Sequence, residues 1–185
     1  MGKPFRLFGP KDKLSAMYSE EIETCLTNGL RPPARLLAVE SSEYRPIVED
    51  INFPAAWIMN TAPSDHPGLH WVAYYRPVNG PTEFFDSGGM KPEDYGLPPG
   101  QPVTKQRLQS SESYVCGHYC VFYLCQRSRG GTLYHVLNLL GSMPVNDREI
   151  FLMDYCTKLM SPKIGSGPKS SRCQCCTCPK KFCPH

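Results

Sequence analysis

The sequence contains no apolar run that approaches the ~20 residues a helix needs to cross a bilayer. Its first residues, Met-Gly-Lys-Pro-Phe-Arg, lack the apolar stretch of a secretory signal, and Arg6 stands where a myristoylation motif requires Ser or Thr. A strong excess of one charge is also lacking, because 20 Lys and Arg stand against 17 Asp and Glu. The composition alone therefore gives no argument for a nucleic-acid partner. We expect an intracellular protein with no membrane partner.

A disulfide-stapled scaffold is also excluded, although the chain has ten cysteines. Five of them fall in the last thirteen residues, and the other five are scattered over the remaining length: Cys25, Cys116, Cys120, Cys125 and Cys156. In a reducing compartment, scattered cysteines are mostly buried small hydrophobes or catalytic thiols.

The chain divides into one globular domain and a tail. Residues 1–160 have enough apolar content for a single core, whereas residues 161–185 are rich in Pro, Gly, Ser, Lys and Cys and are predicted to be disordered. Periodicity predicts helices over 15–28, 115–127, 132–140 and 146–160, and strands over 35–39, 55–60, 69–76, 82–86 and 103–108. Asn146 and Glu149 fit a capping box at the start of the last helix. The sequence thus predicts an α+β fold with an antiparallel or mixed central sheet packed by helices.

Cys116 stands where a polar loop, residues 109–114, enters a helix that is apolar nearly all round. A thiol at a helix N-terminus lies near exposed N–H groups that favour the thiolate, the nucleophilic form. Gly117 follows directly and would let backbone or substrate approach closely. The alternative is that Cys116 is a buried small hydrophobe, as Cys120 and Cys125 are predicted to be.

Three further residues complete a set with the chemistry of a cysteine peptidase. His70, in an aromatic strand, is the candidate base, and Asp86 ends the returning strand of the same predicted hairpin, where it could orient the imidazole. Gln109 could donate its amide to a developing oxyanion, together with the backbone N–H of Cys116. Taken singly, each has an ordinary alternative: a packed histidine, a turn-starting aspartate and a loop glutamine.

The order of these residues carries a resemblance to a known family. The segments 58–61 (Ile-Met-Asn-Thr), 68–75 (Gly-Leu-His-Trp-Val-Ala-Tyr-Tyr), 84–88 (Phe-Phe-Asp-Ser-Gly) and 109–120, which opens with Gln and ends Cys-Gly-His-Tyr-Cys, resemble the adenovirus endopeptidase (adenain) family. That family is related to the ubiquitin-like-protein proteases that process SUMO. The resemblance implies Cys116 as nucleophile, His70 as base, Asp86 as orienting acid and Gln109 as oxyanion donor, with no cofactor. It also implies protein substrates with glycine at the cleavage site, selected by a tunnel that Trp71 closes; the alternative for Trp71 is core packing.

The sequence also departs from the adenoviral pattern. Asp86 stands where those enzymes usually carry Glu, and no cysteine lies between Cys25 and Cys116 to bond an activating peptide. Covalent activation by such a peptide is therefore not implied, and whether a peptide or DNA activates the protein stays an open question. We expect a virus- or transposon-encoded endopeptidase of structural-protein maturation, located in the host nucleus or the virion. The alternatives are a deconjugating isopeptidase for a ubiquitin-like modifier and an inactive binding module.

The cysteine-rich tail offers soft metal ligands in the residues Cys173, Cys175, Cys176, Cys178, Cys183 and His185. Their spacing is tighter than that of the usual paired zinc motif. A zinc site is therefore one of three interpretations of the tail. The others are an oxidation-prone tail and a tail that forms a disulfide with a partner. The basic residues of the tail could also contact DNA.

Overall fold

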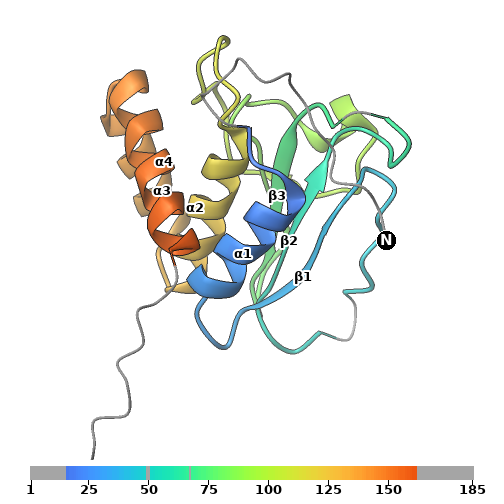
Figure 1. Ribbon diagram of the computed structural model, residues 1–185. Helices are drawn as coiled ribbons and strands as arrows, with labels where there is room; N and C mark the ends of the chain where they lie inside the picture. Colours follow the sequence, from blue (N-terminus) through green and yellow to red (C-terminus); the bar gives the residue numbers. More distant parts are fainter. Residues whose placement is uncertain (1–15, 49–50, 67, 162–185) are drawn as a thin grey trace, which may run out of the picture.

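The computed structural model describes residues 16–48, 51–66 and 68–161. A five-stranded sheet runs in the spatial order β1 (Arg35–Glu40), β2 (Ala55–Asn60), β3 (Trp71–Arg76), β4 (Glu83–Phe85) and β5 (Gln101–Pro102). The outer pairs, β1 with β2 and β4 with β5, are parallel, whereas β2, β3 and β4 pair antiparallel. This mixed sheet packed by helices confirms the predicted α+β fold class (Figure 1). The predicted tail lies outside the described residues, apart from Ser161.

Alternation along the two central strands divides the core between the faces of the sheet. On β3, Ala73 and Tyr75 belong to the apolar cluster shared with the helices, whereas Val72 and Tyr74 belong to a second cluster on the opposite face. Every residue of β2 is buried, and so is β3 up to Tyr75. The sheet is therefore covered on both sides, by helices on one face and by side chains of residues 44, 48, 51, 53, 95 and 97 on the other.

Four α-helices lie on one side of the sheet (Figure 1). These are α1 (Ser19–Gly29), α2 (Cys116–Ser128), α3 (Leu133–Ser142) and α4 (Val145–Met160). In α2, all ten residues from Cys116 to Cys125 are buried, because the helix contacts β3 on one side and α1 and α4 on the other. The start of this buried helix is thus fixed relative to the start of β3. No helix of the described residues is long and apolar enough to cross a membrane.

Two predictions about local structure are wrong. Residues 103–108 form no strand; pairing with β4 is limited to Gln101–Pro102, and the chain then leaves the sheet toward α2. Between β4 and β5 the chain forms a short 3₁₀ helix, η1 (Pro92–Tyr95). At α4 the N-cap is Pro144, and Asn146 lies inside the helix, so there is no capping box from Asn146 to Glu149. The Glu149 carboxylate instead binds the loop before α2.

Candidate active site

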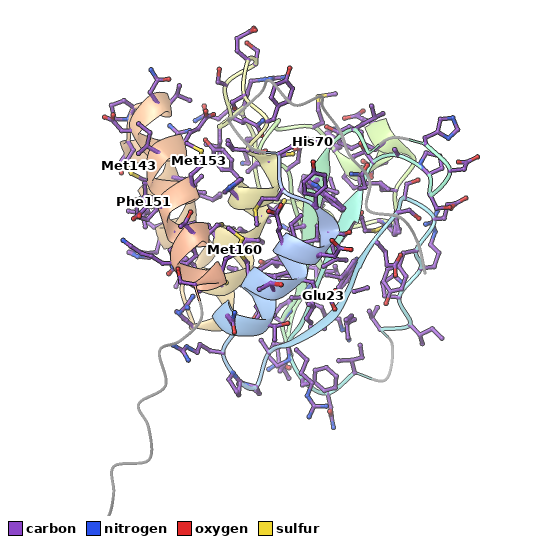
Figure 2. The ribbon with its side chains drawn as sticks, in the orientation of Figure 1. Glu23, His70, Met143, Phe151, Met153 and Met160 are labelled. Carbon is purple, nitrogen blue, oxygen red and sulfur yellow. The ribbon has the colours of Figure 1, made fainter. Side chains whose placement is uncertain are left out.

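His70 and Asp86 meet because β3 and β4 run antiparallel. His70 immediately precedes β3 and Asp86 immediately follows β4, so the start of one strand lies beside the end of the other. Nε2 of His70 lies 2.5 Å from Oδ1 of Asp86. The backbone of Asp86 is fixed in turn by the hydroxyl of Thr104, which donates to its carbonyl oxygen at 2.7 Å. Figure 2 places His70 near the upper end of the sheet in that view.

The carboxylate of Asp86 is completely buried and fully supplied with donors. Besides His70, the backbone N–H of Gly88 donates to Oδ1 at 2.7 Å. The backbone N–H of Met90 donates to Oδ2 at 2.8 Å, and the Tyr95 hydroxyl donates to the same oxygen at 3.1 Å. Burial opposes the charge of this carboxylate, but the hydrogen bond and charge of His70 and the two backbone donors outweigh it and lower the pKa of Asp86. Asp86 is therefore a stable anion that orients the ring.

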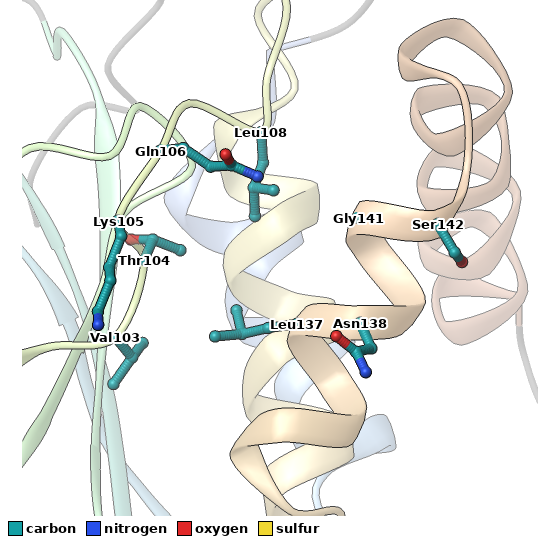
Figure 3. Close-up of a pocket in the computed structure, with 9 residues that line it drawn as sticks. All are labelled: Val103, Thr104, Lys105, Gln106, Leu108, Leu137, Asn138, Gly141 and Ser142. Carbon is teal, nitrogen blue, oxygen red and sulfur yellow. The ribbon is translucent and has the colours of Figure 1, made fainter.

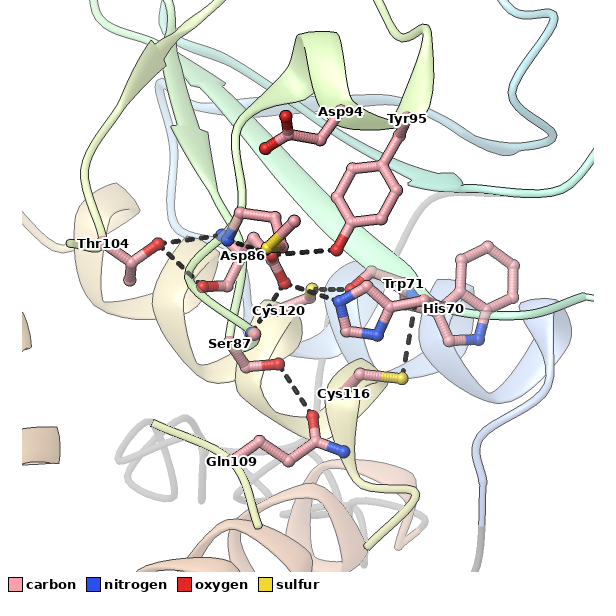
Figure 4. A network of polar contacts seen from close by, with 12 residues as sticks. His70, Trp71, Asp86, Ser87, Asp94, Tyr95, Thr104, Gln109, Cys116 and Cys120 are labelled. Atoms are coloured by element: carbon pink, nitrogen blue, oxygen red, sulfur yellow. Dashed lines mark hydrogen bonds and ion pairs between the residues drawn. The ribbon is translucent and has the colours of Figure 1, made fainter. Parts of the chain in front are cut away.

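Cys116 is the first residue of α2, and its thiol faces the His70 ring (Figure 4). The backbone N–H of Trp71 donates to its sulfur at 3.5 Å. Val115, the N-cap residue, supplies no side-chain hydrogen bond, so the first N–H groups of the helix have no side-chain acceptor from the cap. An uncapped helix N-terminus and a direct N–H donor both favour negative charge on this sulfur.

The ring of His70 links the acid to the thiol. Because Nε2 contacts Asp86, Nδ1 is the nitrogen that remains for Cys116. Burial disfavours the imidazolium, but hydrogen bonds to Asp86 and to Cys116 outweigh that penalty and raise the pKa of His70 to about 10. The ring is therefore protonated at neutral pH, and it lies between the Asp86 carboxylate and the Cys116 sulfur.

Cys120 is the contrasting thiol, one helical turn further along α2. Its Sγ donates to the backbone carbonyl of Trp71 at 3.3 Å, and it is fully buried. Burial, followed by the charges of Cys116 and Asp86, raises the pKa of Cys120 well above its usual value. Cys25, Cys125 and Cys156 are likewise buried free thiols. Among these buried cysteines, Cys116 is the one at a helix N-terminus facing a histidine.

Gln109 lies on the opposite side of the thiol from Asp86 (Figure 4). Its Oε1 accepts a hydrogen bond from the Ser87 hydroxyl at 2.8 Å, which fixes the orientation of the amide. Its Nε2 donates to the carbonyl oxygen of Ser113 at 2.6 Å. A side-chain amide carries two N–H donors, so one remains after this bond. That donor and the N–H groups at the start of α2 are the candidate hydrogen-bond donors to an oxyanion.

The loop that carries Gln109 is held from α4 by two neighbouring charged residues. Arg148 donates to the carbonyl oxygen of Leu108 at 2.5 Å, and Oε1 of Glu149 accepts from the backbone N–H of Ser110 at 2.9 Å. The same oxygen accepts from the Ser113 hydroxyl at 2.8 Å. Sequence reasoning missed this clamp. The only signal was the presence of two neighbouring charged residues near the start of α4, and they turn out to be buried.

Trp71 and Gly117 were predicted to bind substrate, and the structure places both in packing contacts. The Trp71 indole is 5% exposed and donates from Nε1 to the carbonyl oxygen of Met17 at 3.0 Å. A Cβ on Gly117 would lie 3.1 Å from the Met17 Cβ and 3.2 Å from the Cδ1 of Ile22. Both distances are shorter than ordinary van der Waals contact, so the missing side chain of Gly117 favours close packing of α2 against Met17 and α1. The role of both residues toward a substrate stays a prediction.

Two small cavities are lined by the neighbouring residues Trp71 and His70, one cavity by each. One, of about 130 Å³, is lined by Trp71, Asn60 and Gly68, among others. The other, of about 190 Å³, is lined by His70 and Gln109. A third cavity of about 630 Å³ lies between α3 and residues 103–108, where Val103 and Leu137 face each other (Figure 3). Its lining includes none of the four candidate catalytic residues, so we assign the chemistry to the region between the two smaller cavities.

The predicted zinc ligands of the tail lie outside the described residues. Within residues 16–48, 51–66 and 68–161, no group of three or more His, Cys, Asp and Glu side chains is arranged to hold a metal ion. His118, on α2, is buried and its Nδ1 has no hydrogen-bond partner in this part of the chain. Burial lowers the pKa of His118 to about 4, so this ring is neutral and is separate from the charged His70.

Comparison with protein-family models gives no match, and neither does comparison of the sequence with curated proteins. Among solved structures, the chain is similar to the crystal structure of the ASFV pS273R protease in its selenomethionine form. The match has 21% identity and a TM-score of 0.41, and it covers 60% of this chain and 45% of that chain. A likeness at this level carries no argument about activity, so the chemistry of the site is argued from its own geometry.

Proposed function

We propose that the protein is a cysteine peptidase. One observation carries this proposal: a thiol at an uncapped helix N-terminus faces an imidazole whose other nitrogen lies 2.5 Å from a buried carboxylate. Nucleophile, base and orienting acid are thereby joined in one chain of polar contacts. A packed histidine or a buried structural cysteine requires no such alignment, and Cys120 illustrates the ordinary case one turn away.

The proposed reaction is acyl transfer to the thiol. The Cys116 thiolate attacks the scissile carbonyl carbon, and the resulting oxyanion accepts hydrogen bonds from Gln109 and the N-terminus of α2. The His70 imidazolium gives its proton to the leaving amine as the carbon–nitrogen bond breaks, which leaves a thioester on Cys116. The neutral ring then takes a proton from water, the hydroxide oxygen attacks the thioester, and the acid product leaves while the thiol is restored.

The decisive experiment compares two cysteines of one helix. A pool of random peptides with blocked N-termini is incubated with the wild type, with Cys116→Ala and with Cys120→Ala, and new termini are identified by mass spectrometry. We expect cleavage by the wild type and by Cys120→Ala, with loss of at least about 1,000-fold in Cys116→Ala, since the covalent route is removed. Equal inertness of all three proteins would reject the peptidase and favour a binding module.

At the finer level, we propose cleavage after glycine in protein precursors, with structural-protein maturation in a virus or transposon as its setting. The support is steric: the cavity beside Trp71 is small, and hydrogen bonding to Met17 and packing around Gly117 restrain this indole. The cleavage sites recovered from the peptide pool test the preference directly. Enrichment of large side chains immediately before the cleaved bond would contradict it.

The same chemistry could act on a ubiquitin-like modifier, whose glycine-terminated tail would suit the same narrow entrance. A modifier bearing a C-terminal vinyl sulfone separates the two substrates, because it alkylates the nucleophile only when the modifier docks. Labelling of the wild type but not of Cys116→Ala favours the deconjugating isopeptidase. Absence of labelling by a protein that cleaves the peptide pool favours the maturation endopeptidase.

A further inference from the structure

The cavity on the His70 side of the site is polar, and an arginine lines it in addition to His70. Besides His70 and Gln109, its lining includes Arg107, Tyr95 and serines of the loop before α2. Arg107 is exposed, and within the residues that the structure describes it forms no ion pair. No carboxylate is among the described residues that line the cavity. The cavity therefore offers a guanidinium whose charge is not already neutralised by an adjacent acid.

The charge of this guanidinium also acts on the hydrogen-bond network that contains the base. Burial, together with Asp86, raises the pKa of Tyr95, and the positive charge of Arg107 partly offsets that rise. The Tyr95 hydroxyl is itself bonded to the Asp86 carboxylate that holds His70. The charge of Arg107 therefore acts on Tyr95, which is joined through Asp86 to the base. The nearest acid of the loop, Glu112, accepts a hydrogen bond from the Ser111 hydroxyl at 3.2 Å.

The direction of the substrate follows from the proton transfer, and this step rests on the proposed function. The leaving amine must lie against the His70 ring, because that ring supplies its proton. The cavity lined by His70 is therefore on the side of the leaving group, whereas the cavity lined by Trp71 is on the side of the acyl group. The chain that follows the scissile bond must enter or border the cavity of Arg107.

We infer that Arg107 forms a subsite for a carboxylate in the first or second residue after the scissile bond. An Asp or Glu side chain would fit, and so would the free C-terminal carboxylate of a short leaving peptide. The guanidinium presents paired N–H donors that match a carboxylate. Because Arg107 is exposed, the expected gain is modest, roughly fivefold in kcat/KM.

The test uses matched peptides built on a sequence that the wild type cleaves in the random pool. The two positions after the cleaved bond carry Asp, Asn or Lys in turn, and one pair of peptides differs in ending as a free acid or an amide. We expect the wild type to prefer Asp over Asn about fivefold, with the preference shrinking at 1 M salt as exposed charges are screened. Arg107→Gln should abolish the preference, and Arg107→Glu should reverse it in favour of Lys.

Lys105→Gln is the matched control, because it also removes one positive charge. Lys105 is two residues before Arg107 in the sequence, but its side chain lines the separate cavity of Figure 3. This variant should keep the Asp preference of the wild type. Equal cleavage of Asp and Asn peptides by the wild type, or an Asp preference that survives in both Arg107 variants, overturns the subsite while leaving the peptidase intact. The free-acid and amide pair tells a side-chain carboxylate from a terminal one.

Discussion

The two sides of the candidate site are held in different ways. On one side, His70 and Asp86 are placed by the antiparallel pairing of β3 and β4, and Asp86 takes most of its hydrogen bonds from residues within ten positions of it in sequence. On the other side, Gln109 sits on a loop with no strand or helix of its own. Ser87 holds Gln109 through its hydroxyl and its carbonyl oxygen, and side chains of α4 about forty residues away hold the residues that flank Gln109.

The His70–Asp86 side is thus formed by strands that are close in sequence, whereas the Gln109 side also depends on contacts with a helix that is distant in sequence. The register of a hairpin is set by its turn and by side-chain alternation, so the strand ends meet wherever the hairpin forms. The residues that flank Gln109 gain their contacts to Arg148 and Glu149 only once α4 has docked against α2, so the loop is completed by a distant helix even though Ser87 also holds Gln109. Damage to the hairpin should therefore abolish the chemistry, whereas damage to α4 should loosen it.

The largest effect is expected from Asp86→Asn. Both oxygens of Asp86 accept from backbone N–H groups, of Gly88 and of Met90, so either orientation of an Asn amide places its NH₂ group against one of these donors. The change also removes the charge that keeps His70 protonated. We expect kcat/KM to fall by roughly 100-fold or more, because the ring loses its orientation and its partner.

Thermal unfolding of the same variant provides the control. A folded Asp86→Asn protein with near wild-type activity would show that the His70 ring needs no carboxylate here. Asp94→Asn offers a comparison in the same region, since Asp94 is an exposed residue whose carboxylate accepts only from the N–H of Lys91. That variant should retain wild-type activity.

An intermediate effect is expected from loosening the Gln109 loop through α4. Glu149→Ala removes the acceptor of Ser110 and Ser113, and we expect kcat to fall about tenfold with little change in KM, since the oxyanion donor is misplaced rather than lost. Gln109→Ala removes the donor itself and should cost roughly 100-fold in kcat.

The double variant decides whether the two residues act together. If Glu149 works through Gln109, adding Glu149→Ala to Gln109→Ala should cause almost no further loss of kcat. Independent losses that multiply in the double variant would contradict a positioning role for Glu149. Glu149→Gln keeps an oxygen acceptor for both donors and should restore most of the activity lost in Glu149→Ala.

The same contrast explains what could be predicted from the sequence. The predicted strands over residues 69–76 and 82–86, joined by turn residues at 79–81, indicate a hairpin that brings His70 to Asp86. The apolar run from Val115 predicts a helix over 115–127, which the structure begins at Cys116. These are local patterns. The strand predicted over residues 103–108 was wrong because its apolar residues, such as Val103 and Leu108, are buried by contact with the helices rather than by strand pairing.

Glu149 shows the limit of local reasoning most clearly. Its position three residues after Asn146 indicated a capping box, and an acidic residue near a helix N-terminus is favourable in any case. Its actual partners, Ser110 and Ser113, are separated from it by more than thirty residues, and nothing in the spacing of the sequence relates them. Such contacts follow from how α4 packs on α2, which periodicity leaves open.

The smallest effect concerns stability and its dependence on pH. The pKa of His70 is raised from 6.5 to about 10, so its contribution to stability is complete below pH 6.5 and is lost as the pH rises toward 10. The pKa of Asp86 is lowered from 3.8, so its contribution is complete above that value and is lost in acid. The pair should therefore stabilise the fold most between about pH 4 and pH 6.5.

Urea unfolding of the wild type and of His70→Gln at pH 5 and pH 9.5 measures this contribution. We expect the variant to be less stable by about 1–3 kcal/mol at pH 5, the range for a hydrogen bond between charged groups, with a smaller difference at pH 9.5. Gln109→Ala is the control from the other side of the site, because an amide does not titrate and its effect should be equal at both pH values. A His70→Gln difference that is also equal at both pH values would mean that the ring is not held as an imidazolium by Asp86.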